Sequence, residues 1–300
     1  MSVVIVNPAS ASGSTGEAWP QIASDLRSQF GAFRVVFTQR RGDAATLAGD
    51  AARKGAKLII ACGGDGTVSE VANGILASGK DAELGILPSG TGGDFRRTLE
   101  IPARSRDAAR ILRSGRTVRI DVGRVSYIDQ NGNDATRYFV GVASCGMSTK
   151  VIERVKEDKV SFANAMLKTA MQNAPVRLVV QLDDAHDRQL TVSNLCVANA
   201  RYFGGGMKIA PDAKLSDGKF DIVGVGDLSA LKIFTSAPRI YLGSHLSMPE
   251  VSHALAYKVN VRPADHGSEI ALEIDGELPG RLPATFQIIP EALRVRVGAS

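Results

Sequence analysis

A glycine-rich segment between two apolar runs carries the clearest chemical signal in the sequence. It reads LIIACGGDGTVSEVANGIL, from Leu58 to Leu76, and places glycines and Asp65 where a strand-like run gives way to helical spacing. A ligand can approach the backbone of such a loop closely. The first N–H groups of a helix lack partners inside it, and the helix dipole favours negative charge there. These features favour phosphate binding, although a tight strand-to-helix turn would also need glycines.

Two further loops of small polar residues follow predicted strands in the same half of the chain. One is NPASASGSTG, residues 7–16, and the other is PSGTGGDF, residues 88–95. Ligands of open parallel sheets bind beyond the carboxyl ends of the strands. We therefore expect the three loops to converge on one crevice. Neither glycine loop matches the P-loop pattern or the complete dinucleotide-binding fingerprint.

The elements that would position these loops alternate between strand and helix up to about residue 120. Strands are predicted at residues 3–6, 33–38, 58–62 and 84–87, and helices at 17–30, 43–54, after the glycine loop, and at 107–112. This alternation implies right-handed crossovers and a largely parallel sheet.

The second half of the chain changes to strands separated by turns. Strands are predicted at 119–127, 137–143, 176–182, 190–198, 220–225, 255–261 and 269–274, with helical segments near 150–171 and 229–242. We therefore expect an α/β domain at residues 1–120 and a mainly antiparallel β domain at residues 121–300.

Hydropathy and charge indicate where the protein acts and which partners it can bind. No apolar run approaches the roughly 18–20 residues of a membrane span, and the N-terminus reads as a first strand rather than a signal peptide, so we expect a cytoplasmic protein. The formal net charge is +5, and arginines gather between Arg96 and Arg124. Such a run fits either a solvated helix face or a surface for anionic lipid. No aromatic residues interleave with it, which argues against nucleic acid.

Several segments resemble landmarks of the diacylglycerol kinase catalytic-domain superfamily, which includes bacterial lipid kinases and the sphingosine and ceramide kinases. They are VNPASASG, GGDGTVSEVANGI, PSGTGGDF, NARYFGGGMKIAPDAKLSDGKFDI and LEIDGE. NAD kinases share the GGDGT loop, but the helix after it and the acidic motifs of the second half follow the lipid-kinase pattern. The resemblance implies a nucleotide-binding domain at 1–120 and a lipid-substrate domain at 121–300. Gly93 and Ser69 depart from the pattern, because the family usually has Asn at both positions.

The resemblance also implies ligand-binding residues. Asp65 would act through a magnesium ion beside the phosphates, with an Asx-turn that stabilises the loop as the alternative. A structural magnesium ion would take the carboxylate of Asp217 and the carbonyls of Lys214 and Lys219, unless this segment is an ordinary turn. The ATP site would be lined by Asn7, Pro8, Ala9, Ser10, Ala11, Thr38, Gly64, Asp65, Gly66, Thr67, Val68, Ser69, Glu70 and Thr91.

The implied chemistry is transfer of a phosphoryl group from ATP to a lipid hydroxyl. Such transfer depends on positioning and charge neutralisation, and the hydroxyl must lose its proton. The resemblance makes Asp275 and Glu277 of LEIDGE the catalytic pair, together with Asp65. A D-G turn with two solvated acids is the plainer explanation of that segment.

We therefore expect an ATP- and Mg²⁺-dependent kinase for diacylglycerol or a similar lipid, in peripheral contact with anionic membrane surfaces. The alternatives are a kinase for another hydroxyl, such as a sphingoid base or a non-lipid, and a nucleotide- or lipid-binding regulator without turnover. The sequence does not fix the oligomeric state, and a homodimer stays open.

Overall fold

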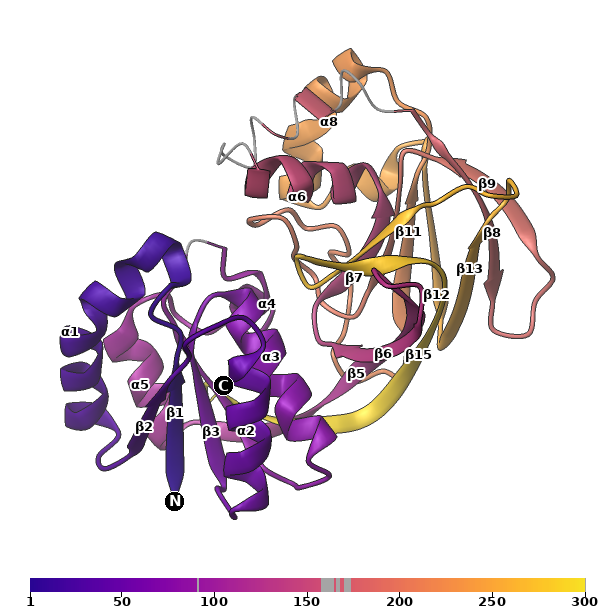
Figure 1. Ribbon diagram of the computed structural model, residues 1–300. Helices are drawn as coiled ribbons and strands as arrows, with labels where there is room; N and C mark the ends of the chain where they lie inside the picture. The colour runs from indigo at the N-terminus through magenta and orange to yellow at the C-terminus, as the bar shows by residue number, and fades with distance from the viewer. Residues whose placement is uncertain (91, 158–164, 166–167, 170–173, 300) are drawn as a thin grey trace. The chain divides into compact units, whose positions relative to one another are not determined.

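The computed structural model describes residues 1–299 except residues 91, 158–164, 166–167 and 170–173 (Figure 1). The chain forms two compact units: the first comprises residues 1–122 and 290–300, and the second comprises residues 123–289. The sequence analysis placed the whole of 121–300 in one domain. The last segment instead returns to the first unit, because Arg294 and Val295 pair in parallel with β4 (Glu83–Pro88).

The first unit is a parallel sheet covered by helices. Its strand order is β15–β4–β3–β1–β2, and every pair is parallel. Helix α1 packs on α5 and α2 packs on α3, and the two pairs lie on opposite sides of the strands (Figure 1). The further bounds are β1 (Ser2–Val6), β2 (Arg34–Phe37), β3 (Leu58–Gly63), α1 (Ser14–Gln29), α2 (Asp43–Arg53), α3 (Asp65–Ala77), α4 (Asp94–Thr98) and α5 (Ser105–Ser114).

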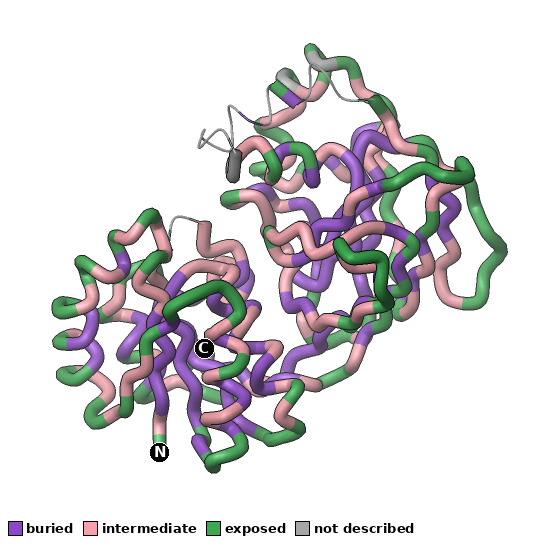
Figure 2. The backbone as a smooth tube through the Cα atoms, viewed as in Figure 1, coloured by how far each residue is buried: buried purple, intermediate pink, exposed green. Residues whose placement is uncertain are grey.

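Burial explains why these strands form. β3 is buried at all its positions, and β1 and β4 at most of theirs, as the purple backbone in Figure 2 shows. Strands covered on both faces read as continuous apolar runs rather than as alternating patterns. The parallel arrangement confirms the predicted fold class, and it puts the carboxyl ends of β1, β3 and β4 at the same edge of the sheet.

The second unit is mainly antiparallel. One path of paired strands runs β12–β11–β10–β7–β14–β15, while β13 joins β15 to β8, and β5 joins β15 to β6. Its bounds are β5 (Arg116–Asp129), β6 (Asp134–Phe139), β7 (Val142–Gly146), α6 (Met147–Glu157), β8 (Val176–Leu182), β9 (Arg188–Val192), β10 (Asn194–Ala198), β11 (Phe220–Val225), α8 (Ala230–Leu242), β12 (Val251–Ala256), β13 (Lys258–Pro263), β14 (Ala271–Ile274) and β15 (Glu277–Val297).

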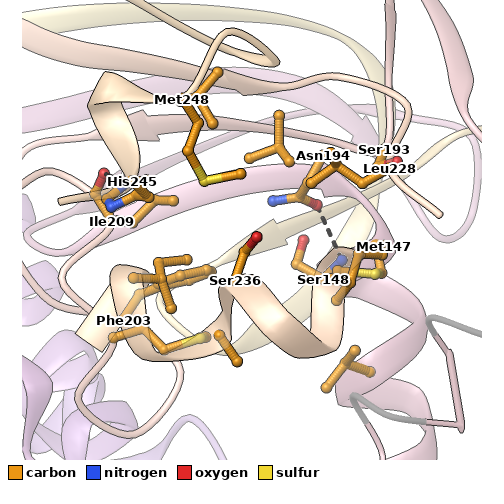
Figure 3. Close-up of a pocket in the computed structure, with 17 residues that line it drawn as sticks. Met147, Ser148, Ser193, Asn194, Phe203, Ile209, Leu228, Ser236, His245 and Met248 are labelled. Atoms are coloured by element: carbon orange, nitrogen blue, oxygen red, sulfur yellow. Dashed lines mark hydrogen bonds between the residues drawn. The ribbon is translucent and has the colours of Figure 1, made fainter. Parts of the chain in front are cut away.

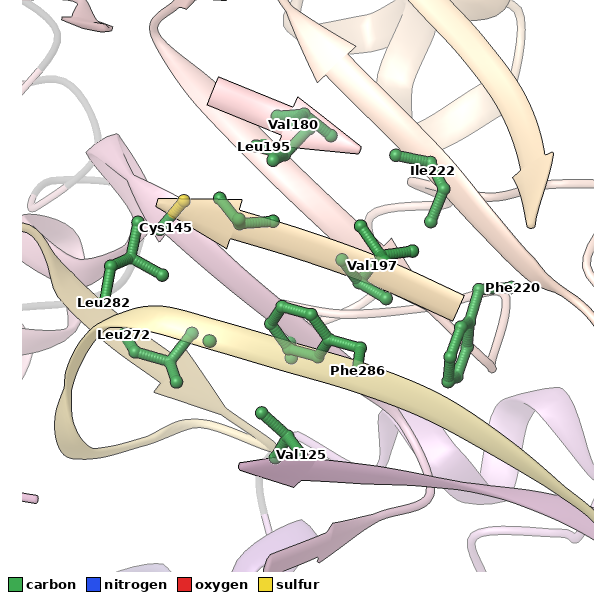
Figure 4. Close-up of a cluster of buried hydrophobic side chains, with 14 of the residues drawn as sticks. Val125, Cys145, Val180, Leu195, Val197, Phe220, Ile222, Leu272, Leu282 and Phe286 are labelled. Atoms are coloured by element: carbon green, nitrogen blue, oxygen red, sulfur yellow. The ribbon is translucent and has the colours of Figure 1, made fainter. Parts of the chain in front are cut away.

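A large apolar cluster fills the interior between these strands, and a smaller cluster lies around Cys196, Ile209 and Val223. Phe139 stacks on Phe220 with ring centroids 5.5 Å apart and meets Phe286 edge-on at 6.2 Å. Figure 4 shows Phe220, Phe286 and Val197 reaching into this interior from different strands. Such ring arrangements add about 0.5–1.5 kcal/mol per pair beyond area burial.

Three predicted strands are each two strands in the structure. The chain changes partner within each apolar run: at Ser193, for example, β9 leaves its partner β8 and β10 begins to pair with β7 and β11. The same change separates β6 from β7 and β12 from β13. A strand-like pattern in the sequence does not reveal the residue at which the chain changes partners, because the partners lie far away in the chain.

The sequence analysis did not predict strand β15 or helix α4. The predicted helix at 150–171 lies only partly within the described residues. β15 contains three prolines, which are rare inside sheets, yet its Leu282, Ala284, Phe286 and Ile288 alternate into the core. Helix α6 ends at Glu157, and most of the rest of the predicted helix 150–171 lies outside the described residues. Within the described chain, no helix has the length and apolarity needed to cross a membrane.

Candidate functional site

The three polar loops of the first unit meet through side-chain and backbone hydrogen bonds. The Asn7 amide donates to Thr67 Oγ1 at 3.1 Å, which joins the first loop to the glycine loop. Thr15 Oγ1 donates to the Ser89 carbonyl at 2.7 Å, and the Ser89 N–H donates to the Gly63 carbonyl at 3.0 Å. The predicted convergence of these loops is therefore present at the carboxyl edge of the sheet.

The first loop is itself held by local contacts. The Ala9 N–H donates to Asn7 Oδ1 at 3.1 Å, and the Ser10 hydroxyl lies 3.4 Å from that of Thr67. Pro8 lies against Gly16, and Ala11 has a left-handed backbone with φ +52°. These predicted nucleotide-site residues form a compact turn beside the start of α3.

Asp65 ties the glycine loop to the third loop. Its carboxylate accepts backbone N–H groups from Gly93 at 2.7 Å, Asp94 at 3.1 Å and Phe95 at 3.1 Å, and so caps the start of α4. A carboxylate offers about four acceptor positions. The remaining capacity fits one contact to a magnesium ion, and the metal role of Asp65 stays a prediction. Thr91, in the third loop, lies outside the described residues.

The departure at Gly93 has a backbone explanation. Gly93 adopts φ +69° at the N-cap of α4, a conformation that glycine and asparagine both tolerate. Replacing the family's usual Asn with Gly therefore keeps the loop geometry and removes one amide side chain.

Other residues predicted to bind the nucleotide make hydrogen bonds or are buried within the protein itself. Glu70 accepts the N–H groups of Gly42 at 3.0 Å and Ala44 at 3.1 Å, which caps α2. Thr38, at the end of β2, is buried and donates its N–H to the Val6 carbonyl at 2.9 Å. The remaining members of the helix start are also buried, namely Thr67, Val68 and Ser69. Their part in nucleotide binding stays a prediction, and the structure gives them a role in holding the loops.

Gly66 differs from its neighbours because the fold does not require a glycine there. A Cβ at Gly63 would lie 2.5 Å from Thr67 Oγ1, and one at Gly90 would lie 2.7 Å from Gly64 Cα, so packing explains these glycines. Among the described residues, a Cβ at Gly66 would meet nothing within 4 Å. As far as those residues show, open space lies over the first turn of α3, where unpaired N–H groups favour an anion.

The acids of the LEIDGE segment are held by distant parts of the second unit. Asp275 has φ +48°, and its carboxylate accepts the N–H groups of Gly141 at 2.9 Å and Val140 at 3.2 Å. Glu277 Oε2 lies 2.6 Å from Arg137 Nη1, and the two side chains are only 16% and 17% exposed. Neither acid is free in solvent, which contradicts the plainer explanation of this turn.

Arg137 is a site residue that the sequence analysis missed. Burial by itself would lower the pKa of Arg137, but the carboxylates of Glu277 and Asp275 raise it above its usual value. The guanidinium therefore stays charged and fixes the position of Glu277. A single arginine inside a strand gives no sequence signal for this pairing.

The predicted magnesium loop forms a turn. Asp217 Oδ1 accepts the Lys219 N–H at 3.1 Å, and Gly218 has φ +72°. Burial raises the pKa of the nearby Asp221, while its partner His253 acts in the opposite direction. The described residues contain no group of three or more His, Cys, Asp or Glu side chains placed to hold a metal, so the roles of Asp217 and of the Lys214 and Lys219 carbonyls stay predictions.

An apolar pocket of about 90 Å³ lies inside the second unit, lined by α6, α8 and the segments around β10 and β11 (Figure 3). Burial lowers the pKa of His245 in its wall, so the imidazole stays neutral near pH 7. The apolar lining includes Met147, Val151, Phe203, Met207, Ile240 and Met248. The sequence analysis missed this pocket, because its walls come from segments far apart in the chain.

Comparison with known proteins identifies the family. A model of the diacylglycerol kinase catalytic domain matches residues 1–125, and one of the YegS C-terminal NAD kinase beta sandwich-like domain matches residues 141–297. The diacylglycerol kinase of Staphylococcus haemolyticus is 31% identical over 293 residues, covering 94% of this chain and 84% of that protein. The chain belongs to the diacylglycerol kinase family. The Mycobacterium tuberculosis diacylglycerol kinase is 33% identical over 261 residues, 84% of this chain and 81% of that protein.

Solved structures show the same fold. A diacylglycerol kinase from Bacillus anthracis has a TM-score of 0.74 at 22% identity, covering 99% of this chain and 96% of that one. A second structure from that organism gives a TM-score of 0.80 at 23% identity, with coverage of 99% and 95%. Membership in the diacylglycerol kinase family confirms the resemblance drawn from the sequence and supports a lipid kinase.

Proposed function

We propose that this protein is an ATP- and Mg²⁺-dependent kinase for the hydroxyl of diacylglycerol or a similar lipid. Family membership supports a kinase, and the open space over Gly66 supports a phosphate-bearing ligand on the first unit. The apolar pocket carries the lipid part of the proposal, because its walls suit a hydrocarbon chain rather than a polar acceptor.

The residues of the chain have distinct tasks in this reaction. The N–H groups that open α3 hold phosphate oxygens, and the glycines let the backbone approach them. Asp275 or Glu277 takes the proton of the lipid hydroxyl, and backbone N–H groups or Arg137 keep each carboxylate in place. Magnesium, when bound, neutralises charge that develops on the phosphates.

Labelled ATP, magnesium and a panel of lipid and non-lipid alcohols test the proposal. Label in phosphatidic acid is the expected result, and label in phosphorylated sphingoid base or ceramide instead supports the runner-up kinase. Nucleotide binding without transfer to any acceptor supports a regulator and contradicts the proposal. An Ala237→Leu variant tests the role of the pocket. The larger side chain fills it, so the KM for lipid should rise more than the KM for ATP.

We also propose peripheral membrane contact, for which α8 is the stronger surface. Ile233, Ala237 and Ile240 of α8 line the pocket, while Leu231 and Leu242 on the same helix are 73% and 75% exposed. Exposed leucines of this kind suit an interfacial helix whose apolar residues enter the lipid. The predicted arginine surface is partly engaged within the protein, because Arg110 pairs with Asp107 and Arg113 donates to the Gln29 carbonyl.

Vesicle co-sedimentation separates the two surfaces. We expect Leu231→Ser with Leu242→Ser to weaken binding at low and high salt, because the contact is apolar. Arg104→Ala with Arg106→Ala should weaken binding to anionic vesicles at low salt, by about 1 kcal/mol per charge at the surface. Unchanged binding by the leucine variant removes α8 from the proposal, and unchanged binding by both variants overturns membrane contact through either surface.

A further inference from the structure

A buried hydrogen-bond chain connects the apolar pocket to the acidic turn of LEIDGE. Glu273 of β14 lies opposite Ser144 of β7 in the strand register, and both are 3% exposed or less. The Ser144 hydroxyl donates to Glu273 Oε2 and lies 2.7 Å from the hydroxyl of Ser148. Glu273 Oε1 accepts the N–H of Gly276, in the turn between the two candidate catalytic acids, at 2.7 Å.

The carboxylate fixes the direction of this chain. The Ser144 hydroxyl donates to Glu273 Oε2, so the carboxyl group is the acceptor and the Ser144 proton points toward it. Ser144 must then accept from Ser148, and the single proton of Ser148 is used. The remaining lone pairs of the Ser148 oxygen can accept a hydrogen bond but cannot supply one. Ser148 lies in the pocket wall beside Asn194, as Figure 3 shows.

The neighbouring amide does not offer an equivalent group. Asn194 Oδ1 accepts the Ser148 N–H at 3.0 Å, and its Nδ2 donates to the Cys196 sulfur at 3.1 Å. The second N–H of that amide can still donate, so Asn194 differs from an acceptor such as Ser148. Ser193 and Ser236 also line the pocket, and among the described residues no hydrogen bond to a charged group fixes either hydroxyl proton. Ser148 is therefore the pocket residue whose hydrogen-bond direction the fold fixes: its hydroxyl oxygen can accept a hydrogen bond from an occupant.

We propose that Ser148 determines the specificity of this pocket by accepting a hydrogen bond from a hydroxyl or amide N–H of the occupant. An ether or ester oxygen at the same place would face an oxygen with no proton to give. The occupant class is thus a lipid with a free donor close to its hydrocarbon chain. Identifying that occupant with the phosphoryl acceptor rests on the proposed function, whereas the polarity of the pocket does not.

The test uses two small isomeric probes, hexanol and pentyl methyl ether. Hexanol can donate a hydrogen bond and the ether cannot, while both have the same number of heavy atoms. Their affinities are measured by calorimetry on the full chain without nucleotide, so the result does not depend on kinase activity. Because the probes differ in hydration, the informative quantity is the change in their affinity ratio between variants.

Glu273→Gln should reverse the direction of the hydrogen bonds between residue 273, Ser144 and Ser148. The glutamine oxygen still accepts the Gly276 N–H, but its amide now donates to Ser144, which in turn donates to Ser148. The Ser148 proton then faces the pocket, and we expect the ratio to shift toward the ether by about three- to tenfold, the size of one hydrogen bond. On a Ser148→Ala background the same substitution should leave the ratio unchanged.

Two further variants complete the design. Ser236→Ala is the matched control, because it removes a pocket hydroxyl outside the chain, and Glu273→Gln should still shift the ratio in its presence. If Glu273→Gln does not fold, Ser144→Ala frees the Ser148 proton and should shift the ratio in the same direction. An unchanged ratio in the folded variant, or no binding of either probe to the parent, overturns the proposal. If the parent protein phosphorylates no acceptor while the shift in the affinity ratio is present, only the proposed function is contradicted.

Discussion

Two Asp-Gly turns, one in each unit, follow apolar strands and yet are built in opposite ways. At the end of β3 the glycines keep side chains away, and the backbone at the start of α3 faces open space. At the end of β14 side chains dominate: Asp275 binds two backbone N–H groups and Glu277 binds Arg137. In both turns the aspartate accepts backbone N–H groups, but the candidate binding surface is backbone in the first unit and side chain in the second. The surroundings of a turn, more than its residues, decide its chemistry.

Substitution of Asp275 and of Asp65 is the strongest test of this difference between the two turns. We expect Asp275→Asn to lower kinase turnover by about a hundredfold or more, the contribution expected of a general base, and to leave ATP binding unchanged. Asparagine tolerates the left-handed backbone of Asp275, so the turn should survive. Steady-state kinetics and a separate nucleotide titration measure the two effects. Glu269→Gln is the control, since that side chain is 75% exposed; parental turnover in Asp275→Asn would refute the catalytic role.

Asp65→Asn should act on the fold as well as on turnover. The amide can replace part of the acceptor capacity that binds Gly93, Asp94 and Phe95, but its NH₂ group opposes the other N–H donors. We expect the free energy of unfolding to fall by about 1.5–3 kcal/mol, the value of charged hydrogen bonds. Denaturant titration measures this loss. A fall in turnover with unchanged stability would instead assign Asp65 to magnesium alone.

The same contrast explains what the sequence could predict. The parallel sheet and the three loops were predicted, because buried strands read as apolar runs and the loops are rich in glycine. Arg137 and Ser144 were missed because their partners Glu277 and Glu273 lie more than 100 positions away. The pocket was missed because its walls come from separate segments. Helix α4 was missed because its cap comes from Asp65, in another loop. Side-chain partners are set by the fold and leave no local pattern.

Gly66→Ala sharpens the distinction between glycines kept for a ligand and glycines kept for packing. Alanine favours a helix over glycine by roughly 1 kcal/mol, and its Cβ would meet no atom of the described residues within 4 Å, so stability should stay equal or rise. We expect ATP affinity to fall about tenfold, equivalent to about 1.4 kcal/mol. Gly90→Ala is the contrasting variant, because its Cβ would lie 2.7 Å from Gly64 Cα and should destabilise the loop. Unchanged ATP affinity in Gly66→Ala would place the phosphates elsewhere.

The last expected effect concerns the C-terminal segment that returns to the first unit. Arg296 binds Glu83 through two contacts, at 2.7 and 2.8 Å, and the Thr117 hydroxyl donates to the same carboxylate at 2.6 Å. Burial alone would raise the pKa of Glu83, but these hydrogen bonds outweigh it and lower the pKa below its usual value.

A carboxylate whose pKa is lowered on folding stabilises the protein above the pKa of the unfolded chain, roughly pH 4 for glutamate. That stability is lost as the pH falls through the folded pKa. Glu83→Gln should therefore cost about 1.5 kcal/mol at pH 7, with a smaller difference from the parent at acidic pH. Urea titrations across this range measure the difference, and Asp81→Asn, at a 61% exposed acid that also faces arginines, is the control with little expected change. A difference that is equal at pH 7 and in the acid range would show that Glu83 holds the returning strand by packing rather than by its charge.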